Sequence, residues 1–311
     1  MAVSIRTSKN MLQYLYPLLA VLIWSGNTVV NKLAAGSIYP AEIGFYRWLL
    51  AGLLFTPFML RPAWRNRQAI RPHVLKISAL GALGMAVYQS LAYYAAHRTS
   101  AINMGIVLAL MPLMTLALSI PLLGQRPGLP ALLGGVVSLP GVLVVISSGH
   151  PASVATHGMG SGDAMMLIAT LAYAIYSVLL KRWQLKLPAL QLLYLQIIVA
   201  VLLLLPLYLA SPKAGLTPAN MPLIAFAGVF ASMLAPLAWM RGVAALGPSR
   251  MTLFFNLLPL FTALIAAGVL GEPLARYHLA GGALTLVGVL LTERGQNKPA
   301  TVPPAACKNT A

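Results

Sequence analysis

The stretch LPLFTALIAAGVLGEP at residues 258–273 resembles a stretch found 147 positions earlier, MPLMTLALSIPLLGQR at residues 111–126. Aligned without a gap, residues 109–144 and 256–291 share leucines, glycines, a proline, a threonine and a valine. The identical positions of the first copy are Leu110, Pro112, Leu113, Thr115, Leu123, Gly124, Leu132, Gly134, Gly135, Leu139, Gly141, Val142 and Leu143. Chance does not align so many such residues, so the chain contains an internal duplication.

The composition places the chain in a lipid bilayer. Of its 311 residues, 59% are hydrophobic and 8% are charged, and a water-soluble globule cannot cover that much apolar surface. A crossing helix needs roughly 20 apolar residues. Such runs occur near 12–34, 42–60, 74–96, 102–122, 129–147, 163–181, 190–210, 221–240, 250–270 and 276–292. We therefore expect an all-α membrane protein with ten transmembrane helices.

The net charge of +17 is distributed as a topology signal. Lysines and arginines concentrate in alternate loops, such as 61–76 and 181–186, whereas the other loops carry Lys32, Arg98, Lys213 and Arg276. By the positive-inside rule this asymmetry predicts that both termini are cytoplasmic. The charge is thus not the footprint of a nucleic-acid partner.

The predicted topology determines how the two copies are oriented in the membrane. An offset of 147 residues spans five predicted helices, an odd number, so the two copies cross the membrane in opposite senses. Their fronts agree more weakly, as AVLIWSGNTVVNK at 20–32 and ATLAYAIYSVLLK at 169–181. The predicted division is a five-helix repeat at 1–150, a linker at 151–162, an inverted repeat at 163–293 and a disordered cytoplasmic tail at 294–311. Inverted repeats are typical of transporters that work by alternating access.

Polar and aromatic side chains interrupt several of the apolar runs. Trp24, Asn27, Thr28 and Asn31 follow helical spacing and share one face, which should point to the protein interior or to a wet cavity. Interhelical hydrogen bonding and packing is the alternative for any single residue. For the set we expect a substrate cavity, with contacts from Trp24, Asn27, Tyr88, Gln89, Asn103, Tyr173, Tyr176, Trp239 and Asn256.

Two prolines occupy equivalent positions in the predicted fourth and ninth helices. Pro112 and Pro259 each remove a backbone hydrogen bond, which frees the carbonyls of Leu108 and Phe255. A gating hinge and a static kink are both compatible with this pattern.

The four acidic residues, Glu42, Asp163, Glu272 and Glu293, fall at or near predicted helix ends. Proton-coupled exporters of cationic drugs need a buried carboxylate, so we expect facilitated transport of a neutral or zwitterionic cargo. The remaining candidates for proton binding are five histidines: His97 near a helix end, and His73, His150, His157 and His278 in or beside loops, where we expect them to be solvated.

Arg47 is the one strong cation inside a predicted span. We expect it to reach outward to the membrane surface or to brace Glu42. The alternative is that it marks an anionic substrate such as a sugar phosphate.

Enzyme and scaffold functions find little support. Cys307 is the single cysteine, so neither a disulfide nor a cysteine metal site is expected, and paired aspartates, an HExxH site and a phosphate loop are missing. No loop could hold a soluble sensor domain. We expect no enzyme activity, no cofactor and no metal; the sequence leaves the oligomeric state open, a monomer included.

Several segments resemble the drug/metabolite transporter superfamily, and more narrowly its ten-helix EamA-type exporters. They are WSGNTVVNK at 24–32, FYRWLLAGLL at 45–54, YYAAHRTSAINMGIVLALMPLMTLAL at 93–118 and the segment 245–291. The overall pattern is most similar to bacterial amino acid exporters. The resemblance implies a multi-pass protein of the bacterial inner membrane that exports aromatic amino acids, methionine and threonine; the alternative is a proton-coupled exporter of drugs or other metabolites. Gln125 departs from the pattern, since the family has an acid there, as this chain has at Glu272.

Overall fold

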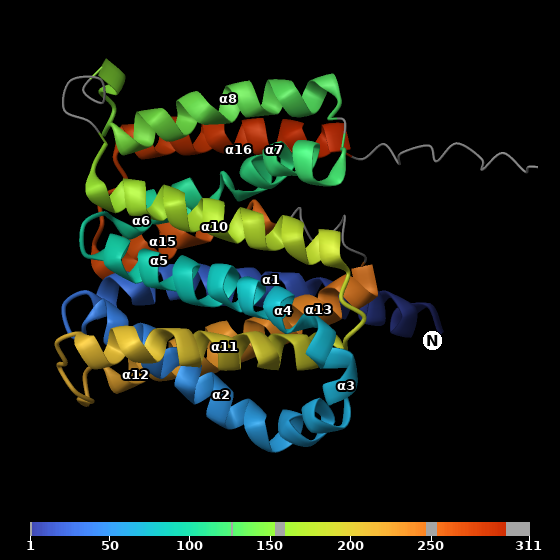
Figure 1. Cartoon of the computed structure of the whole chain (residues 1–311). Helices are drawn as coiled ribbons and strands as arrows, with labels where there is room; N and C mark the ends of the chain where they lie inside the picture. Colours follow the sequence, from blue (N-terminus) through green and yellow to red (C-terminus); the bar gives the residue numbers. More distant parts are fainter. Residues whose placement is uncertain (1, 126, 153–158, 247–253, 297–311) are drawn as a thin grey trace, which may run out of the picture.

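The computed structural model describes residues 2–125, 127–152, 159–246 and 254–296, with side chains throughout except at 2–12, 244 and 293–296. Within these ranges every regular element is helical and no strand occurs. The helices run side by side across Figure 1. Seven helical segments are long and apolar enough to cross a membrane, namely Pro40–Arg65, Arg67–Ala96, Ala101–Leu123, Leu129–Ile146, Ser161–Trp183, Ala189–Ala210 and Met221–Val243. Helices α1, α15 and α16 account for the other predicted runs, and their crossing remains a prediction.

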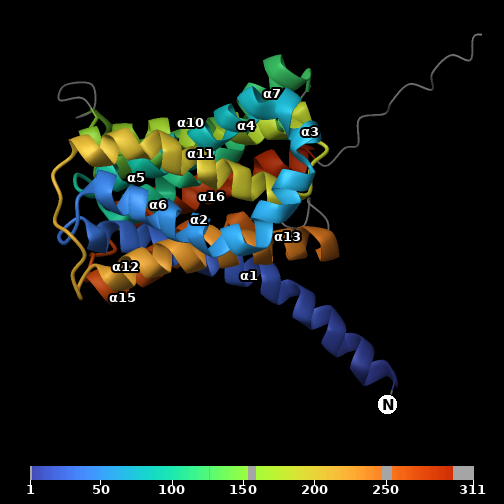
Figure 2. The same ribbon diagram turned by 60° about the horizontal axis from the view of Figure 1, so that its bottom comes forward.

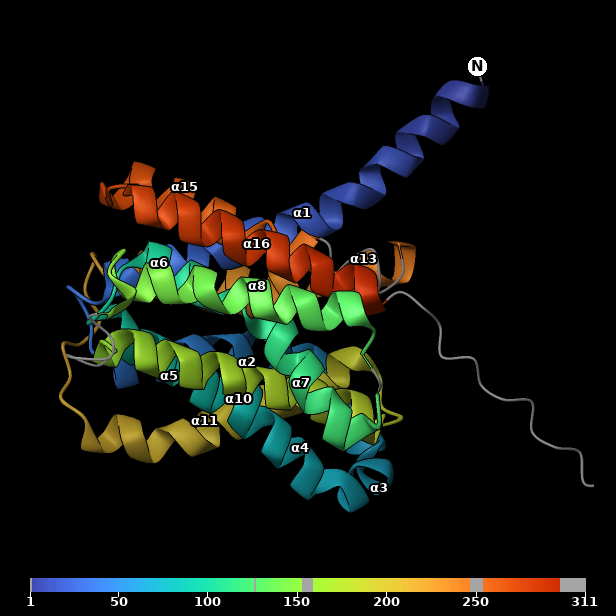
Figure 3. The same cartoon turned by 90° about the horizontal axis from the view of Figure 1, so that it is seen from above.

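The first half begins with a helix that is longer than expected. Helix α1 starts at Ala2 rather than near residue 12, and its N-terminal part extends away from the bundle (Figures 2 and 3). The elements of this half are α1 (Ala2–Ala34), α2 (Pro40–Arg65), α3 (Arg67–Ile70), η1 (Arg71–His73), α4 (Val74–Gly81), η2 (Ala82–Val87), α5 (Tyr88–Ala96), α6 (Ala101–Leu108), α7 (Met111–Leu123) and α8 (Leu129–Ile146).

The second half follows the predicted linker, whose residues 153–158 lie outside the described ranges. Its elements are α10 (Ser161–Trp183), α11 (Ala189–Ala210), α12 (Met221–Ala225), η3 (Phe226–Leu234), α13 (Ala235–Leu246), α15 (Leu258–Leu270) and α16 (Arg276–Gln296). Helix α16 runs past residue 293, so the predicted tail starts too early, and its residues 297–311 lie outside the described part.

The shared prolines and glycines act on the backbone in the same way in both halves. Helix α7 begins with Pro112 in its first turn, directly after the turn that ends α6, and α15 begins with Pro259 in its first turn. Proline lacks the N–H that would continue the preceding helix. Gly124 and Gly271 then end these helices in the left-handed conformation, at φ of 67° and 65°, which glycine adopts without steric cost.

Two π-helical segments also fall at corresponding places. Adding 147 to the bounds of η2, Ala82–Val87, gives residues 229–234, which lie inside η3, Phe226–Leu234. In η3 the hydroxyl of Ser232 donates to the carbonyl oxygen of Ala227, five residues earlier, over 2.8 Å. Such π segments widen a helix and often occur at functional sites.

The two ends of the bundle differ in charge. One end, called here the basic end, carries the turns at 61–73 and 182–188, where arginines and lysines concentrate. The opposite end, called here the acidic end, carries the turns at 35–39, 97–100, 211–220 and 271–275 (Figure 1). This end is named after Glu42, Asp163 and Glu272, the acidic residues with described side chains, which lie beside these turns. The apolar core occupies the space between the ends, around α1, α6, α8, α10 and α15 and between α2 and α11.

Candidate functional site

A cavity of about 980 Å³ lies among helices α1, α7, α10, α11, α13 and α15. Its lining includes Gln125, Leu185 and Leu187, which belong to turns at the basic end, and the exposed side chain of Lys181. The cavity therefore reaches the basic end of the bundle. Its volume is at the upper end of the range of about 300–1,000 Å³ that is common for small-molecule sites.

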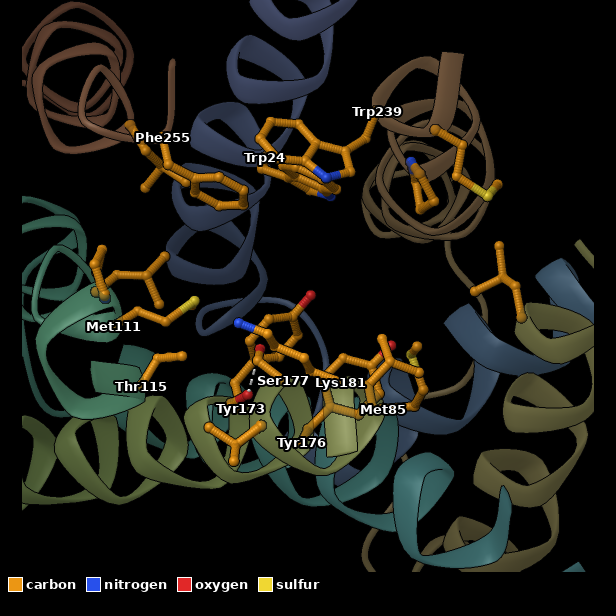
Figure 4. Close-up of a pocket in the computed structure, with 18 of the residues that line it drawn as sticks. Trp24, Met85, Met111, Thr115, Tyr173, Tyr176, Ser177, Lys181, Trp239 and Phe255 are labelled. Atoms are coloured by element: carbon orange, nitrogen blue, oxygen red, sulfur yellow. Dashed lines mark hydrogen bonds between the residues drawn. The ribbon is translucent and has the colours of Figure 1, made fainter. Parts of the chain in front are cut away.

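One wall of the cavity is an aromatic cluster of Trp24, Trp239 and Phe255 (Figure 4). The rings of Trp24 and Phe255 are stacked with centroids 5.4 Å apart, and Trp239 meets Phe255 edge to face at 4.6 Å. The indole Nε1 of Trp24 donates to the carbonyl oxygen of Ala231 over 3.2 Å. The cluster joins α1, α13 and the segment before α15, and its ring faces suit an apolar or aromatic ligand.

The facing wall comes mainly from α10 and contains Tyr173, Tyr176 and Met85 (Figure 4). The rings of Tyr173 and Tyr176 lie 5.1 Å apart, and Tyr173 is 4.9 Å from the ring of Tyr88. Gly84 of η2 permits this arrangement, because a Cβ at that position would overlap the ring of Tyr176. Four of the substrate contacts expected from the sequence therefore line opposite walls of the cavity: Trp24 and Trp239 on one wall, and Tyr173 and Tyr176 on the other.

A smaller pocket of about 90 Å³ continues the cavity inward and shares Trp24, Met85 and Tyr173 with it. The other lining residues include Asn27, Tyr88, Gln89 and Arg47. Asn31 connects two of these side chains, since its Oδ1 accepts from Asn27 Nδ2 at 3.4 Å and from Gln89 Nε2 at 3.3 Å. The predicted polar face of α1 therefore points inward.

Arg47 corrects the sequence-based expectation. Its side chain is only 4% exposed and lines the inner pocket, so it does not reach outward. It donates from Nε to Ser232 Oγ over 2.7 Å and from Nη1 to Asn27 Oδ1 over 3.2 Å. Nor does it brace Glu42, whose carboxylate accepts from backbone N–H groups of the α11–α12 turn. The rotation of α2 against α1 and η3 directs Arg47 inward, and sequence spacing does not report that rotation.

The two predicted hinge prolines also lie at the cavity. Pro112 and Pro259 both line it, together with Leu108 and Leu258 beside the two helix breaks. The carbonyl oxygen of Leu258 accepts from Ser25 Oγ of α1 over 3.1 Å. Both interruptions of the helical backbone therefore face the same space.

Asn103 is the predicted contact that lies elsewhere. It does not belong to the lining of either pocket but to a polar network at the acidic end. Its Nδ2 donates to Asp163 Oδ1 at 3.4 Å, and its Oδ1 lies 3.2 Å from Nε2 of His278. Asp163 also accepts from Thr99 Oγ1 over 2.5 Å.

The expectation that His278 is solvated is wrong, because its side chain is buried, with 7% exposed. Its Nδ1 accepts from the N–H of Ala275 over 3.2 Å, which fixes the ring toward Asn103. His97 follows the end of α5, and partial loss of hydration together with the nearby charges of Lys32 and Arg98 holds its pKa below the ordinary 6.5. His157 lies outside the described residues.

Further contacts join helices at the acidic end. Glu272 accepts from the N–H groups of Ala101 and Ile102 over 2.8 and 3.1 Å, at the N-terminus of α6, where a negative charge is favourable. Lys32 Nζ donates to the carbonyl oxygens of Ala96 and Thr99 over 2.9 and 2.7 Å. We call the set Lys32, Thr99, Asn103, Asp163, Glu272 and His278 the acidic-end seal, since it joins α1, α5, α6, α10 and α16 on the side away from the cavity mouth.

Several lining residues were not singled out from the sequence, among them Met85, Met111, Thr115, Lys181, Gln196 and Phe255. Methionines and leucines look like core residues in an apolar run, so their exposure to a cavity leaves no periodic signal. Lys181 had a signal, since it aligns with Lys32 in the two fronts of the repeat. Among the described residues, no group of three or more His, Cys, Asp and Glu side chains could hold a metal ion.

In a comparison with known protein families, one family model matches this chain in two segments. The sequence model of the EamA-like transporter family matches residues 11–147 and again residues 160–294. A solved crystal structure of a protein superposes on 92% of this chain and 99% of its own, with a TM-score of 0.63 at 17% identity, which bears on the fold alone.

Individual relatives are transporters by name. The uncharacterized transporter YyaM of Bacillus subtilis is 28% identical over 280 residues, which is 88% of this chain and 91% of the relative. The uncharacterized inner membrane transporter YedA of Escherichia coli K12 is 25% identical over 87% of each chain. A probable terminal-alkyne amino-acid exporter of Streptantibioticus cattleyicolor is 26% identical over 73% of this chain and 76% of its own.

Proposed function

The chain belongs to the EamA-like transporter family, and from that premise we propose that it exports amino acids, namely aromatic and other neutral ones such as methionine and threonine. The observation that carries the proposal is the cavity between two aromatic walls, Trp24, Trp239 and Phe255 on one side and Tyr173 and Tyr176 on the other. Aromatic rings stack on aromatic cargo and also attract an ammonium group over their faces. The relative named as a probable amino-acid exporter is in keeping with this cargo class.

The proposal includes an inner-membrane topology of ten helices in two inverted repeats, with cytoplasmic termini and the basic end in the cytoplasm. The cavity then opens to the cytoplasm and the acidic-end seal closes the periplasmic side. Such a state can load cargo from inside the cell. Export follows when the seal opens and the basic end closes, as alternating access requires. The helix breaks at Pro112 and Pro259 lie at the cavity, where a change in bend would alter both openings.

The described lining also supports facilitated rather than proton-coupled transport. None of the described residues that line the two pockets is an aspartate or a glutamate. A cationic drug would therefore meet Arg47 and Lys181 without a compensating carboxylate. The runner-up, a proton-coupled exporter of drugs or other metabolites, would have to use titratable groups such as Asp163 and His278 in the acidic-end seal. We further propose that no cofactor and no nucleic acid takes part.

Uptake into liposomes tests the proposal. Purified protein is reconstituted, and the entry of radiolabelled phenylalanine is followed with and without an imposed pH gradient, with empty liposomes as the control. We expect protein-dependent uptake that is equal under both conditions and that unlabelled tryptophan, methionine and threonine inhibit. Uptake driven by the pH gradient would favour the runner-up. Uptake of labelled phenylalanine, and in turn of labelled tryptophan, methionine and threonine, no greater than in empty liposomes would dismiss these amino acids as cargo.

A further inference from the structure

The inner pocket contains a buried cation whose neighbours are neutral. The guanidinium of Arg47 bonds to Ser232, Asn27 and, at 3.4 Å, to the hydroxyl of Tyr93. Its Cζ lies 4.9 Å from the centroid of the Trp48 ring. A buried, unpaired charge is costly, and proteins usually pair it with an opposite charge. The contacts around Arg47 supply hydrogen bonds and a ring face but no negative charge.

The described carboxylates are engaged at the acidic end. Glu42 accepts from the N–H groups of Ala214 and Gly215, Asp163 from Thr99, and Glu272 from the start of α6. None of these carboxylates bonds to Arg47. These carboxylates therefore supply no negative charge to Arg47, and the inner pocket that it lines adjoins the cavity that reaches the basic end.

Arg47 also has donors to spare for such a group. A guanidinium has five N–H donors, and the bonds to described residues come from Nε and Nη1. The donors of Nη2 have no acceptor among the described residues. The indole N–H of Trp48, another lining residue of the inner pocket, is buried and likewise without an acceptor in this part of the chain. Two adjacent residues of α2 thus hold unused donors at one pocket.

We propose that Arg47 is the receptor for a carboxylate of the transported metabolite, with the apolar part of that metabolite lying between the aromatic walls of the larger cavity. The inner pocket of about 90 Å³ accommodates a small polar group, and the cavity of about 980 Å³ accommodates the rest. The planar guanidinium matches a carboxylate with two parallel hydrogen bonds. This inference rests on the proposed export function, and it makes the carboxylate, not the ammonium group, the feature that a cargo must carry.

The test compares three probes that share a phenyl ring: L-phenylalanine, 3-phenylpropionate, which lacks the amine, and phenethylamine, which lacks the carboxylate. Binding to the purified full chain in detergent is measured by titration calorimetry. Wild-type protein should bind the two carboxylates at least tenfold more tightly than phenethylamine. Arg47→Gln should weaken both carboxylates about tenfold or more, and Arg47→Lys should retain part of the affinity because it keeps the charge without the planar fork.

Arg61→Gln is the matched control, because Arg61 is an exposed arginine on the same helix, and it should bind all probes as the wild type does. Should Arg47→Gln not fold, the Arg47→Lys variant and the wild-type probe series decide. Equal affinity for phenethylamine, or unchanged phenylalanine binding by folded Arg47→Gln, overturns the receptor while leaving amino acid export intact. Arg47-dependent binding of 3-phenylpropionate without binding of phenylalanine upholds the receptor and dismisses amino acid cargo. If no carboxylate binds, both proposals fail.

Discussion

Ser138 donates its hydroxyl hydrogen to the backbone carbonyl of Thr285, the residue 147 positions further along with which it aligns in the sequence. The surrounding glycines pair reciprocally. A Cβ on Gly134 would overlap the carbonyl oxygen of Gly288, and one on Gly141 would overlap that of Gly281. Helices α8 and α16 are therefore antiparallel and in close contact, as Figures 1 and 3 also show. This relationship is what an axis between two inverted copies would produce.

The first prediction concerns this contact. Gly141→Ala should lower stability by about 1–3 kcal/mol, because the added methyl group meets backbone atoms that cannot move aside. Gly268→Ala in α15 is the control, since no atom lies within 4 Å of its added Cβ, and it should be neutral or slightly stabilising. Thermal unfolding of both variants in detergent measures the difference. Equal unfolding temperatures would show that α8 and α16 do not pack closely enough at Gly141 to exclude a methyl group.

The second prediction concerns the helix breaks. Pro112→Ala restores an N–H and should allow α6 and α7 to join, which slows the exchange between the two openings. We expect the uptake rate per folded molecule to fall several-fold while the yield of folded protein changes less. Pro259→Ala should behave alike, and Pro57→Ala, at an exposed position inside α2, should not. Wild-type rates for Pro112→Ala would mean that the interruption is a static kink.

The third prediction concerns the acidic-end seal. Glu272→Gln replaces the carboxylate that holds the N–H groups of Ala101 and Ile102 by a neutral amide, and charge-assisted bonds are roughly twice as strong as neutral ones. Hydrogen–deuterium exchange of residues 97–104 should become about tenfold faster. Gln125→Ala, the equivalent position at the basic end, should leave that exchange unchanged. Unaltered exchange in Glu272→Gln would show that this carboxylate does not hold the seal closed.

The fourth prediction concerns the aromatic wall. Trp239→Ala removes the edge-to-face contact with Phe255 and, with it, a surface for an aromatic cargo. Aromatic pairs contribute about 0.5–1.5 kcal/mol beyond area burial, so phenylalanine should bind roughly threefold to tenfold more weakly, while threonine should change less. Trp64→Ala is the control, because Trp64 is 68% exposed on α2. An equal loss for both amino acids would mean that Trp239 supports the fold rather than the cargo.

Local backbone chemistry explains which features the sequence could predict. Pro112 and Pro259 interrupt helices wherever they stand in one, because proline lacks an N–H and its ring crowds the preceding turn. Gly124 and Gly271 end helices because they adopt positive φ without cost. The inward face of α1 followed from the cost of exposing Trp24 and Asn27 to lipid. Each of these features depends only on neighbours in the chain and on the presence of a bilayer.

The remaining features depend on partners that are distant in sequence. Asn103 is a polar residue in an apolar run, which is typical of a cavity contact. In the structure it instead contacts His278, 175 residues away, and belongs to the acidic-end seal. Arg47 could have turned outward by its spacing alone, and its direction was decided by how α2 packs against Ser232, 185 residues further along. The sequence by itself determined the helices and their breaks, because these follow from local backbone chemistry and hydrophobicity, and its resemblance to known sequences indicated the transporter family. Only the tertiary structure decided which polar groups meet at the cavity and which meet at the seal, because the rotation of each helix about its axis is set by packing against helices from the other half of the chain.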